Sequence, residues 1–274
     1  MGGKLRKGLS AILCLSLLCL LASPVEAHLG TPIACYQSLN PVTVDGKWTS
    51  PDEWSDALET PLYKSFSSEL NGTAYFCTKH DGDYIYILID FVSDVSLDAN
   101  DGCGVSFDTN HDGGSFPKSD DYRFNFLWTT PTTSKFYMLK GAGDGWQKAD
   151  GNIAELVPVP GSQAASSLAP SPRSSSPHMI YEFKIPKAIF AASPETIGFA
   201  AAVWHNPLRK SPAEVLLTWP KDYLRDVPAT WGDLTLSTVP IPELSPPGLG
   251  LASMIALAAS LLAWRRLGRS RMRG

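Results

Sequence analysis

Short runs of β-branched and aromatic residues, separated by Gly, Asp and Pro turns, follow one another from residue 41 onward. The clearest run is 84–92 (YIYILIDFV), whose alternating side chains are apolar on both faces, as in a central strand of a sandwich. The Asp81-Gly82 pair before it is typical of a hairpin turn. The predicted strands are 73–80, 84–92, 102–108, 122–130, 135–141, 153–159, 179–186, 197–205, 214–219 and 231–236. This pattern, with almost no helical period, predicts an all-β fold: a single antiparallel β-sandwich over residues 41–237.

A few segments depart from the strand pattern. Residues 28–40 are predicted to be a short lead-in, and one or two helical turns are expected after Pro186. Residues 160–178 (PGSQAASSLAPSPRSSSPH) have little to bury and are predicted to form a mobile loop between strands. Residues 238–247 contain four prolines and are predicted to be a stiff spacer.

Both ends of the chain have the pattern of targeting segments. Residues 1–27 combine a basic start, an uncharged apolar stretch and small residues before His28, which predicts a cleaved signal peptide. Residues 248–264 are uncharged and about long enough for a membrane-spanning helix. The tail 265–274 carries five arginines and no acidic residue, which predicts that it is cytoplasmic and that the domain lies at the extracellular face of the membrane.

The charge of the exported part limits its partners. Its 28–245 segment holds 15 of the 23 basic residues and 26 of the 27 acidic residues, a net charge of −11. Such a surface repels nucleic acid and anionic lipid headgroups and favours neutral ligands and hard cations. A nucleic-acid partner is therefore excluded.

Three cysteines remain after removal of the signal peptide: Cys35, Cys77 and Cys103. An odd number outside the cell predicts one disulfide and one free thiol, and the sequence does not determine the pairing.

The sharpest local motif is Asp108-Thr109-Asn110-His111-Asp112-Gly113, which matches the first six positions of an EF-hand-type calcium loop. Alternate positions of such a loop converge on one ion, and glycine permits its sharp turn. Position twelve is Ser119 instead of Glu, but Asp120 and Asp121 follow directly. We therefore expect a calcium site formed by Asp108, Asn110, Asp112, Asp120 and Asp121. A second acidic cluster of Asp94, Asp98, Asn100 and Asp101 fits no such spacing and is predicted to be a solvated turn.

Several segments, in order, resemble the family 9 carbohydrate-binding modules and the wider DOMON-like (jelly-roll) sandwiches. They are Val44-Asp45-Gly46-Lys47 with Glu53-Trp54 and Ala57, the run Asp81 to Ile87, Gly104 to Asp108 with Asp121 to Phe124, Tyr181 to Pro186, and Trp231 to Leu234. The resemblance spans about residues 41–237. It implies a non-catalytic module whose partner is a glycan or polysaccharide. The 160–178 segment has no counterpart in it.

The resemblance directs attention to tryptophans, because sugar sites stack flat aromatic faces against pyranose rings and use amides for the hydroxyls. Trp54, Trp219 and Trp231 fall at positions that the family pattern assigns to core packing. Trp146 lies in a glycine-rich turn and Trp204 ends a strand, so these two are predicted to be exposed platforms. Gln147 and Asn206 beside them are the predicted hydrogen-bonding partners.

The tail resembles the sorting signals that exosortase or archaeosortase enzymes process. Ile241-Pro242-Glu243-Leu244 precedes the apolar segment, and Arg265-Arg266 follow it. The resemblance implies a sorting peptidase as a partner and cleavage of the tail; a permanent membrane anchor is the alternative.

Two other functions remain open. Some DOMON-like sandwiches hold haem, for which Met138, Met179, His80, His111 and His205 are the candidate ligands, and no covalent haem motif is present. A structural surface or adhesion spacer is the third reading. No hydrolase, metalloprotease or nucleotide-binding signature is found, and Glu182 with Asp90 is only a weak candidate for a glycosidase pair.

Overall fold

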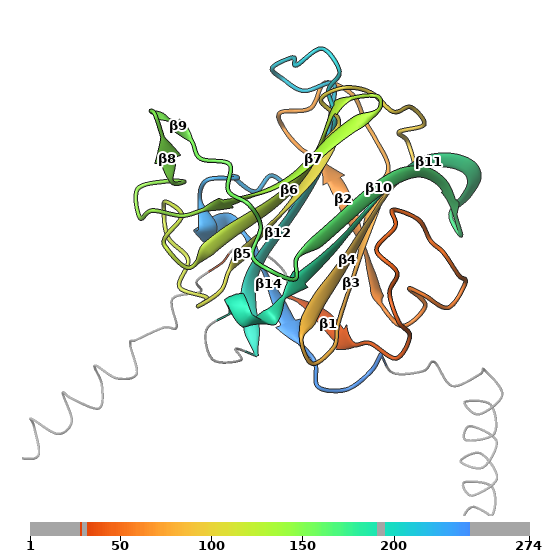
Figure 1. Ribbon diagram of the computed structural model, residues 1–274, viewed down its shortest axis with the longest axis horizontal. Coiled ribbons are helices and arrows are strands. Elements are labelled where there is room, and N and C mark those ends of the chain that lie inside the picture. Colours follow the sequence, from red (N-terminus) through yellow and green to blue (C-terminus); the bar gives the residue numbers. More distant parts are fainter. Residues whose placement is uncertain (1–27, 29–31, 191–194, 242–274) are drawn as a thin grey trace, which may run out of the picture. The chain divides into compact units, whose positions relative to one another are not determined.

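Two β-sheets pack against each other in the computed structural model, which describes residues 28, 32–190 and 195–241 (Figure 1). Sheet A has the order β14–β12–β5–β6–β7, and β13 follows β14 along one edge of β12. Sheet B has the order β10–β11–β4–β3. Among the described residues the strands are β1 (Ile33–Gln37), β2 (Leu58–Lys64), β3 (Ala74–His80), β4 (Tyr84–Phe91), β5 (Gly102–Asp108), β6 (Asp121–Thr130), β7 (Thr133–Lys140), β8 (Lys148–Ala149), β9 (Asn152–Ile153), β10 (Gln163–Ser171), β11 (Ser174–Pro186), β12 (Thr196–His205), β13 (Val215–Trp219) and β14 (Gly232–Leu236).

Two strands join the sheets along one side. β1 pairs in parallel with both β14 and β3, and β2 pairs antiparallel with both β13 and β3. Short 3₁₀ turns, η1 (Lys187–Ile189) and η2 (Pro228–Thr230), complete the described elements. The turn predicted after Pro186 is therefore present. The β-sandwich prediction is confirmed in its all-β character and its largely antiparallel pairing.

The main core lies between the two sheets. Phe76 of β3 contacts Phe199 of β12, with ring centroids 5.8 Å apart, and Phe126 of β6 contacts Tyr181 of β11 at 5.9 Å. β4 alternates as predicted: its isoleucines lie in this core, whereas Tyr86 and Leu88 pack in a second cluster on the outer face of sheet B. Both faces of this strand are therefore buried.

The segment between β1 and β2 covers that second cluster. Glu182 of β11 is fully buried and accepts hydrogen bonds from the backbone N–H of Asp45 (2.9 Å) and of Gly46 (2.8 Å), and from Trp54 Nε1 (3.1 Å). Beside it, buried Lys79 pairs with Asp56 at 2.7 Å. The Asp-Gly and Glu-Trp signatures of the sequence resemblance therefore hold this segment against sheet B.

Glu182 should make folding stability depend on pH. Burial raises the pKa of Glu182 to about 7 from its ordinary 4.5. As the pH rises, the Glu182 carboxyl loses its proton at a lower pH in the unfolded chain than in the folded protein. The contribution of this carboxyl to folding stability is therefore complete below pH 4.5 and disappears as the pH rises through about 7. The full change is about 3 kcal/mol, from about 1.4 kcal/mol per pKa unit. Glu182→Gln keeps the shape of the side chain and cannot ionise, so its urea midpoint should fall less between pH 5 and pH 8. Parallel pH profiles of the two proteins would contradict the assignment.

Some predicted boundaries are wrong. Most of the 160–178 segment, predicted as a mobile loop, forms β10 and the start of β11, which pair with each other. β10 is at the edge of sheet B, where Pro170 falls at a shift in register, as prolines in sheets do. The predicted lead-in 28–40 contains β1. Of the predicted strand 153–159, only Ile153 belongs to a strand.

The disulfide prediction is also wrong. Cys35, Cys77 and Cys103 are free and buried. Cys35 and Cys103 lie in the core between the sheets, whereas Cys77 faces the second cluster. Burial raises the pKa of Cys35 and of Cys77 to about 12, which makes both thiols poor nucleophiles.

The predicted signal peptide (1–27), membrane segment (248–264) and basic tail (265–274) lie outside the described residues. Within 28, 32–190 and 195–241, no helix has the length and apolar character needed to cross a membrane.

Candidate functional site

A cleft of about 690 Å³ opens on the outer face of sheet A. The middle strands of sheet A carry small side chains here: Gly104 of β5 lies opposite Ala202 of β12, and Ser106 lies opposite Ala200. The longer side chains of Arg123 and Asn125 lie over Gly104. A Cβ at Gly104 would collide with the side chains of the neighbouring strand. The larger lining residues include Arg123, Asn125, Tyr137, Trp204, Tyr223 and Asp226.

The floor of the cleft is polar. Arg123 Nη1 donates to Ser106 Oγ and to Tyr223 Oη, each at 3.0 Å, and Arg123 Nε donates to Asn125 Oδ1 at 2.9 Å. These bonds fix the orientation of the Asn125 amide. Asn125 is 3% exposed and its Nδ2 has no hydrogen-bond partner. A buried amide donor without a partner costs free energy that a ligand acceptor can recover.

Aromatic rings stand on two sides of this floor. Tyr137 on β7 is opposite Asn125 of β6 in the strand register, and Trp204 lies at the end of β12. Both rings are half-buried. Trp204 Nε1 donates to the carbonyl of Asn100 at 2.9 Å, which fixes the ring, and Lys135 Nζ lies over the Tyr137 ring at 4.8 Å. Fixed rings beside an amide donor are the combination that binds a pyranose.

Of these lining residues, Trp204 was predicted from the sequence, whereas Arg123, Asn125 and Tyr137 were not. The sequence pattern that could have indicated Arg123 and Asn125 is the alternation along β6, where the core residues Phe124 and Phe126 separate polar residues. A polar strand face is usually solvated, so the alternation alone does not identify a binding face.

The other predicted ligand residues have different places. Trp146 is 3% exposed, so the prediction that its ring is exposed is wrong. It packs in a cluster with Leu139 and Tyr223, which line the cleft, and its Nε1 donates to Asp226 at 2.6 Å. Gln147 is half-buried and its backbone N–H bonds to Lys140. The Asn206 side chain bonds to both backbone groups of Lys210 and thereby closes a turn. Trp54, Trp219 and Trp231 are buried, as predicted.

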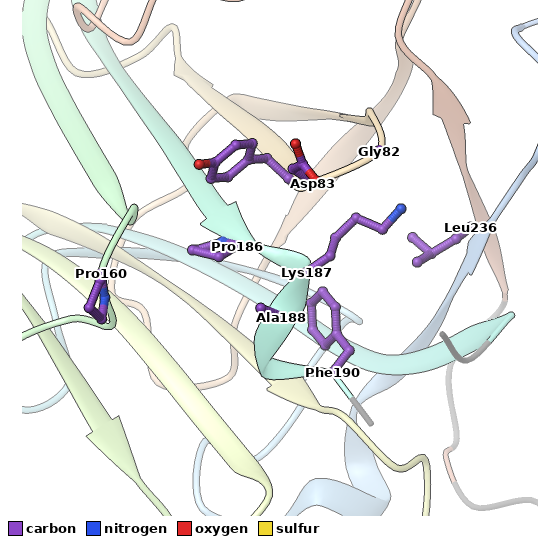
Figure 2. A pocket seen from close by; sticks show the side chains of 9 residues that line it. Gly82, Asp83, Pro160, Pro186, Lys187, Ala188, Phe190 and Leu236 are labelled. Atoms are coloured by element: carbon purple, nitrogen blue, oxygen red, sulfur yellow. The ribbon is translucent and has the colours of Figure 1, made fainter. Parts of the chain in front are cut away.

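A second hollow, of about 500 Å³, lies where β11 ends (Figure 2). Lys187 and Phe190 project from the turn after β11, across from Leu236. Its described lining residues include the aromatic residues Tyr84 and Phe190, and Phe190 is only 8% exposed. The sheet A cleft is the better candidate for a sugar ring.

Three carboxylates meet at the other end of β5 and β6. Asp108, Asp120 and Asp121 each place an oxygen within 4.8 Å of the others. Asp120 Oδ2 and Asp121 Oδ1 are buried without hydrogen-bond partners. The loop between the strands turns sharply at Gly113, which has φ +57°. Converging oxygens that lack protein partners fit a hard cation such as calcium.

The electrostatics of this carboxylate group agree with its geometry. Burial, followed by the charges of Asp108 and Asp120, raises the pKa of Asp121 to about 8. Burial acts in the same direction on Asp108, but hydrogen bonds from His28 and from Gly113 N–H hold the pKa of Asp108 below its ordinary value. The charged form of Asp121 is therefore disfavoured in this group, and a bound cation would favour it.

Two of the predicted calcium ligands, Asn110 and Asp112, make other contacts. Asp112 forms an ion pair with Lys118 at 2.8 Å, and the Asn110 side chain accepts from Asp112 N–H at 3.0 Å. The structure thus brings together Asp108, Asp120 and Asp121 of the five predicted residues.

The second acidic cluster is not a solvated turn. Asp94 and Asp101 are 4% and 0% exposed, and His205 Nδ1 lies 3.1 Å from Asp101 Oδ2. The hydrogen bond to Asp101 raises the pKa of His205 to about 9, and burial raises the pKa of Asp94 to about 6. The prediction was wrong because His205, about a hundred residues further along the chain, covers this turn.

No protein-family model matches the chain, and no curated protein matches it. Solved structures do match. A family 9 carbohydrate-binding module from Caldicellulosiruptor kristjanssonii in complex with glucose is 14% identical, with a TM-score of 0.55 over 78% of this chain and 100% of that chain. A family 9 module from the same organism in complex with cellotriose is also 14% identical, with a TM-score of 0.55 over 79% and 98% of the two chains. The chain therefore has the fold of the family 9 carbohydrate-binding modules.

Proposed function

We propose that this protein is a non-catalytic carbohydrate-binding module that holds a sugar ring in the cleft of sheet A. The observation that carries the proposal is that Asn125, whose buried Nδ2 has no hydrogen-bond partner, lines one cleft together with the rings of Tyr137 and Trp204. A sugar hydroxyl accepts from this amide while the apolar face of the pyranose packs on a ring. The solved structures of the same fold, with glucose and cellotriose bound, make β-linked glucose oligomers the first ligands to test.

Binding without catalysis fits the acidic groups of the cleft. Asp226 is its only carboxylate among the described lining residues, and glycoside hydrolysis uses two. Hydrogen bonds from Arg225 and Trp146 overcome the effect of burial and hold the pKa of Asp226 below its ordinary value. The other carboxylates considered, Glu182 and Asp90, are both buried in sheet B. We therefore assign no general acid to this face.

A glycan array with the purified protein tests the proposal directly. We expect binding to glucose-containing oligosaccharides, followed by millimolar-to-micromolar affinity for cellotriose in isothermal titration calorimetry. An array without any glycan signal, in calcium and in chelator alike, would contradict the proposal. An absorbance spectrum of the same sample tests for bound haem. Two of the candidate haem ligands, Met138 and Met179, are packed in the main core.

The proposal includes calcium as a stabilising ion. Asp108, Asp120 and Asp121 would hold it, and it would neutralise charge in an exported segment with a net charge of −11. The ion would lie where β5 ends and β6 begins, and its role would be to fix the connection between these two strands, which carry residues of the cleft floor.

We further propose that the module acts at the extracellular face of the membrane and is anchored by residues 248–264. Removing residues 246–274 should release the protein into the medium, because this is the strongly hydrophobic segment that remains after loss of the signal peptide. Cell fractionation measures the release, and a truncated protein that stays with the membrane would contradict the anchor. Mass spectrometry of the full-length surface protein distinguishes the two fates of the tail, since a sorting peptidase would remove peptides from 249–274.

A further inference from the structure

A histidine ring is enclosed beside the carboxylate group. His28 is 2% exposed, and its Nε2 lies 3.1 Å from Asp108 Oδ2. The fold leaves space for this ring, because a Cβ at Gly198 would collide with it. On the other side of the ring, Nδ1 is buried without a hydrogen-bond partner, although Asp233 Oδ1 is only 3.1 Å away.

A second histidine lies close to the Asp233 carboxylate. His111, in the loop after β5, places Nε2 2.8 Å from Asp233 Oδ1, and the two imidazole centroids are 4.6 Å apart. Ligand atoms of His28, His111 and Asp233 all lie within 4.8 Å of one another. Two imidazoles and one carboxylate therefore converge on one point from three distant segments of the chain.

One of the two neutral tautomers of His28 presents a lone pair to a cation at this point. When Nε2–H donates to Asp108, the neutral ring carries a lone pair on Nδ1. A lone pair facing a carboxylate oxygen at 3.1 Å is repulsive, and a positive ion between the two atoms removes the repulsion. A carboxylate that fixes the far nitrogen of a histidine is the usual support of a metal-binding imidazole.

We propose that His28, His111 and Asp233 bind a divalent transition-metal ion of the zinc or copper class. Imidazole nitrogens suit these ions, whereas calcium prefers oxygen ligands. Three protein ligands leave a further coordination position for water. The His111 and Asp233 side chains are 31% and 25% exposed, so an ion reaches the site from solvent while His28 stays enclosed. This site is separate from the proposed calcium site, and Asp108 contacts both.

Zinc titration of the exported protein, purified without a polyhistidine tag, tests this proposal. In isothermal titration calorimetry we expect one zinc ion per chain at this site, and a rise in melting temperature with Zn²⁺. His111→Asn keeps a residue that tolerates the left-handed backbone there (φ 58°), and it should weaken zinc binding by about 100-fold or more. Asp233→Asn should have an effect of similar size. In both variants cellotriose binding serves as the test of correct folding.

The matched control is His205→Asn, because Asp94, Asp101 and His205 form the other histidine-containing cluster of the described residues. This control should keep the zinc affinity of the unmodified protein. If His205→Asn removes zinc binding and His111→Asn does not, the site has been assigned to the wrong cluster. A protein that binds no zinc by calorimetry, or binds it equally well in the His111 and Asp233 variants, overturns the proposal.

Discussion

Replacing Trp204 with alanine should weaken cellotriose binding by about 1–3 kcal/mol, a loss of roughly 5- to 150-fold in affinity. The half-buried ring lines the cleft of sheet A, and its Nε1 bond to the carbonyl of Asn100 holds it in place before a ligand arrives. A ring that is already fixed loses little conformational entropy on binding. Isothermal titration calorimetry gives the change, and Trp204→Phe, which keeps an aromatic face, should recover much of the affinity.

Trp128→Ala is the matched control for this prediction. Trp128 is also half-buried near the end of a strand of sheet A, but its Nε1 approaches Ser166 and its ring packs against the main core. We expect this control to lower the melting temperature and to leave cellotriose affinity unchanged. If Trp204→Ala lowers stability while affinity stays the same, Trp204 is a packing residue and the sugar lies elsewhere.

Asn125→Ala tests the polar floor of the same cleft. It removes a buried donor that has no partner in the free protein, so the free protein should lose little stability from that atom. The ligand would lose one hydrogen bond. Asn125→Ala also removes the acceptor of Arg123 Nε, so the melting temperature should fall, and reduced cellotriose affinity of the folded variant is the result that identifies Asn125 as a binding residue.

The strands were predictable where local pattern and tertiary packing agree. β5 occupies the predicted residues 102–108, and β12 begins one residue before the predicted 197–205. In both strands apolar side chains alternate toward the main core. β10 was missed because serine, alanine and proline have low strand propensity; its pairing with β11 overrides that propensity.

The candidate cleft was predictable only in part, because its shape depends on sheet A as a whole. Trp204 was identifiable as an aromatic residue at a strand end. Asn125 belongs to a polar face that would be solvated on a flat sheet, and the cleft over it is completed by distant segments such as 65–67 and 223–226. Trp146 was misjudged because its neighbouring glycines suggest an open turn, whereas Asp226, eighty residues away, packs over its indole nitrogen.

The carboxylate group was better predicted since it is local. Asp108 and Asp121 end and begin strands that pair with each other, so Asp108 is directly opposite Asp121 in the register. A hairpin of this kind brings its two ends together whatever the rest of the fold does. The sequence could not indicate that Lys118 would pair with Asp112, because that contact depends on how the loop folds back.

Calcium should raise the melting temperature of the protein, and the carboxylate group should be the cause. An ion that binds the folded state stabilises it by RT ln(1 + [L]/Kd), about 2.7 kcal/mol at a hundredfold excess over Kd. The unpartnered oxygens of Asp120 and Asp121 would coordinate the calcium ion, and the positive charge of the ion would remove the repulsion between the neighbouring carboxylates. Differential scanning calorimetry in millimolar calcium and in chelator measures the difference.

The double variant Asp120→Asn/Asp121→Asn should lose this calcium response. Without calcium it should be at least as stable as the unmodified protein, because two of the crowded carboxylates have become neutral amides of the same shape. Asp144→Asn, which changes an exposed aspartate on another turn, is the matched control and should keep the full response. Equal melting temperatures of the unmodified protein in calcium and in chelator would mean that Asp108, Asp120 and Asp121 form an acidic turn without an ion. A calcium response that persists in the double variant would place the ion elsewhere, with the Asp94–Asp101–His205 cluster as the next group to mutate.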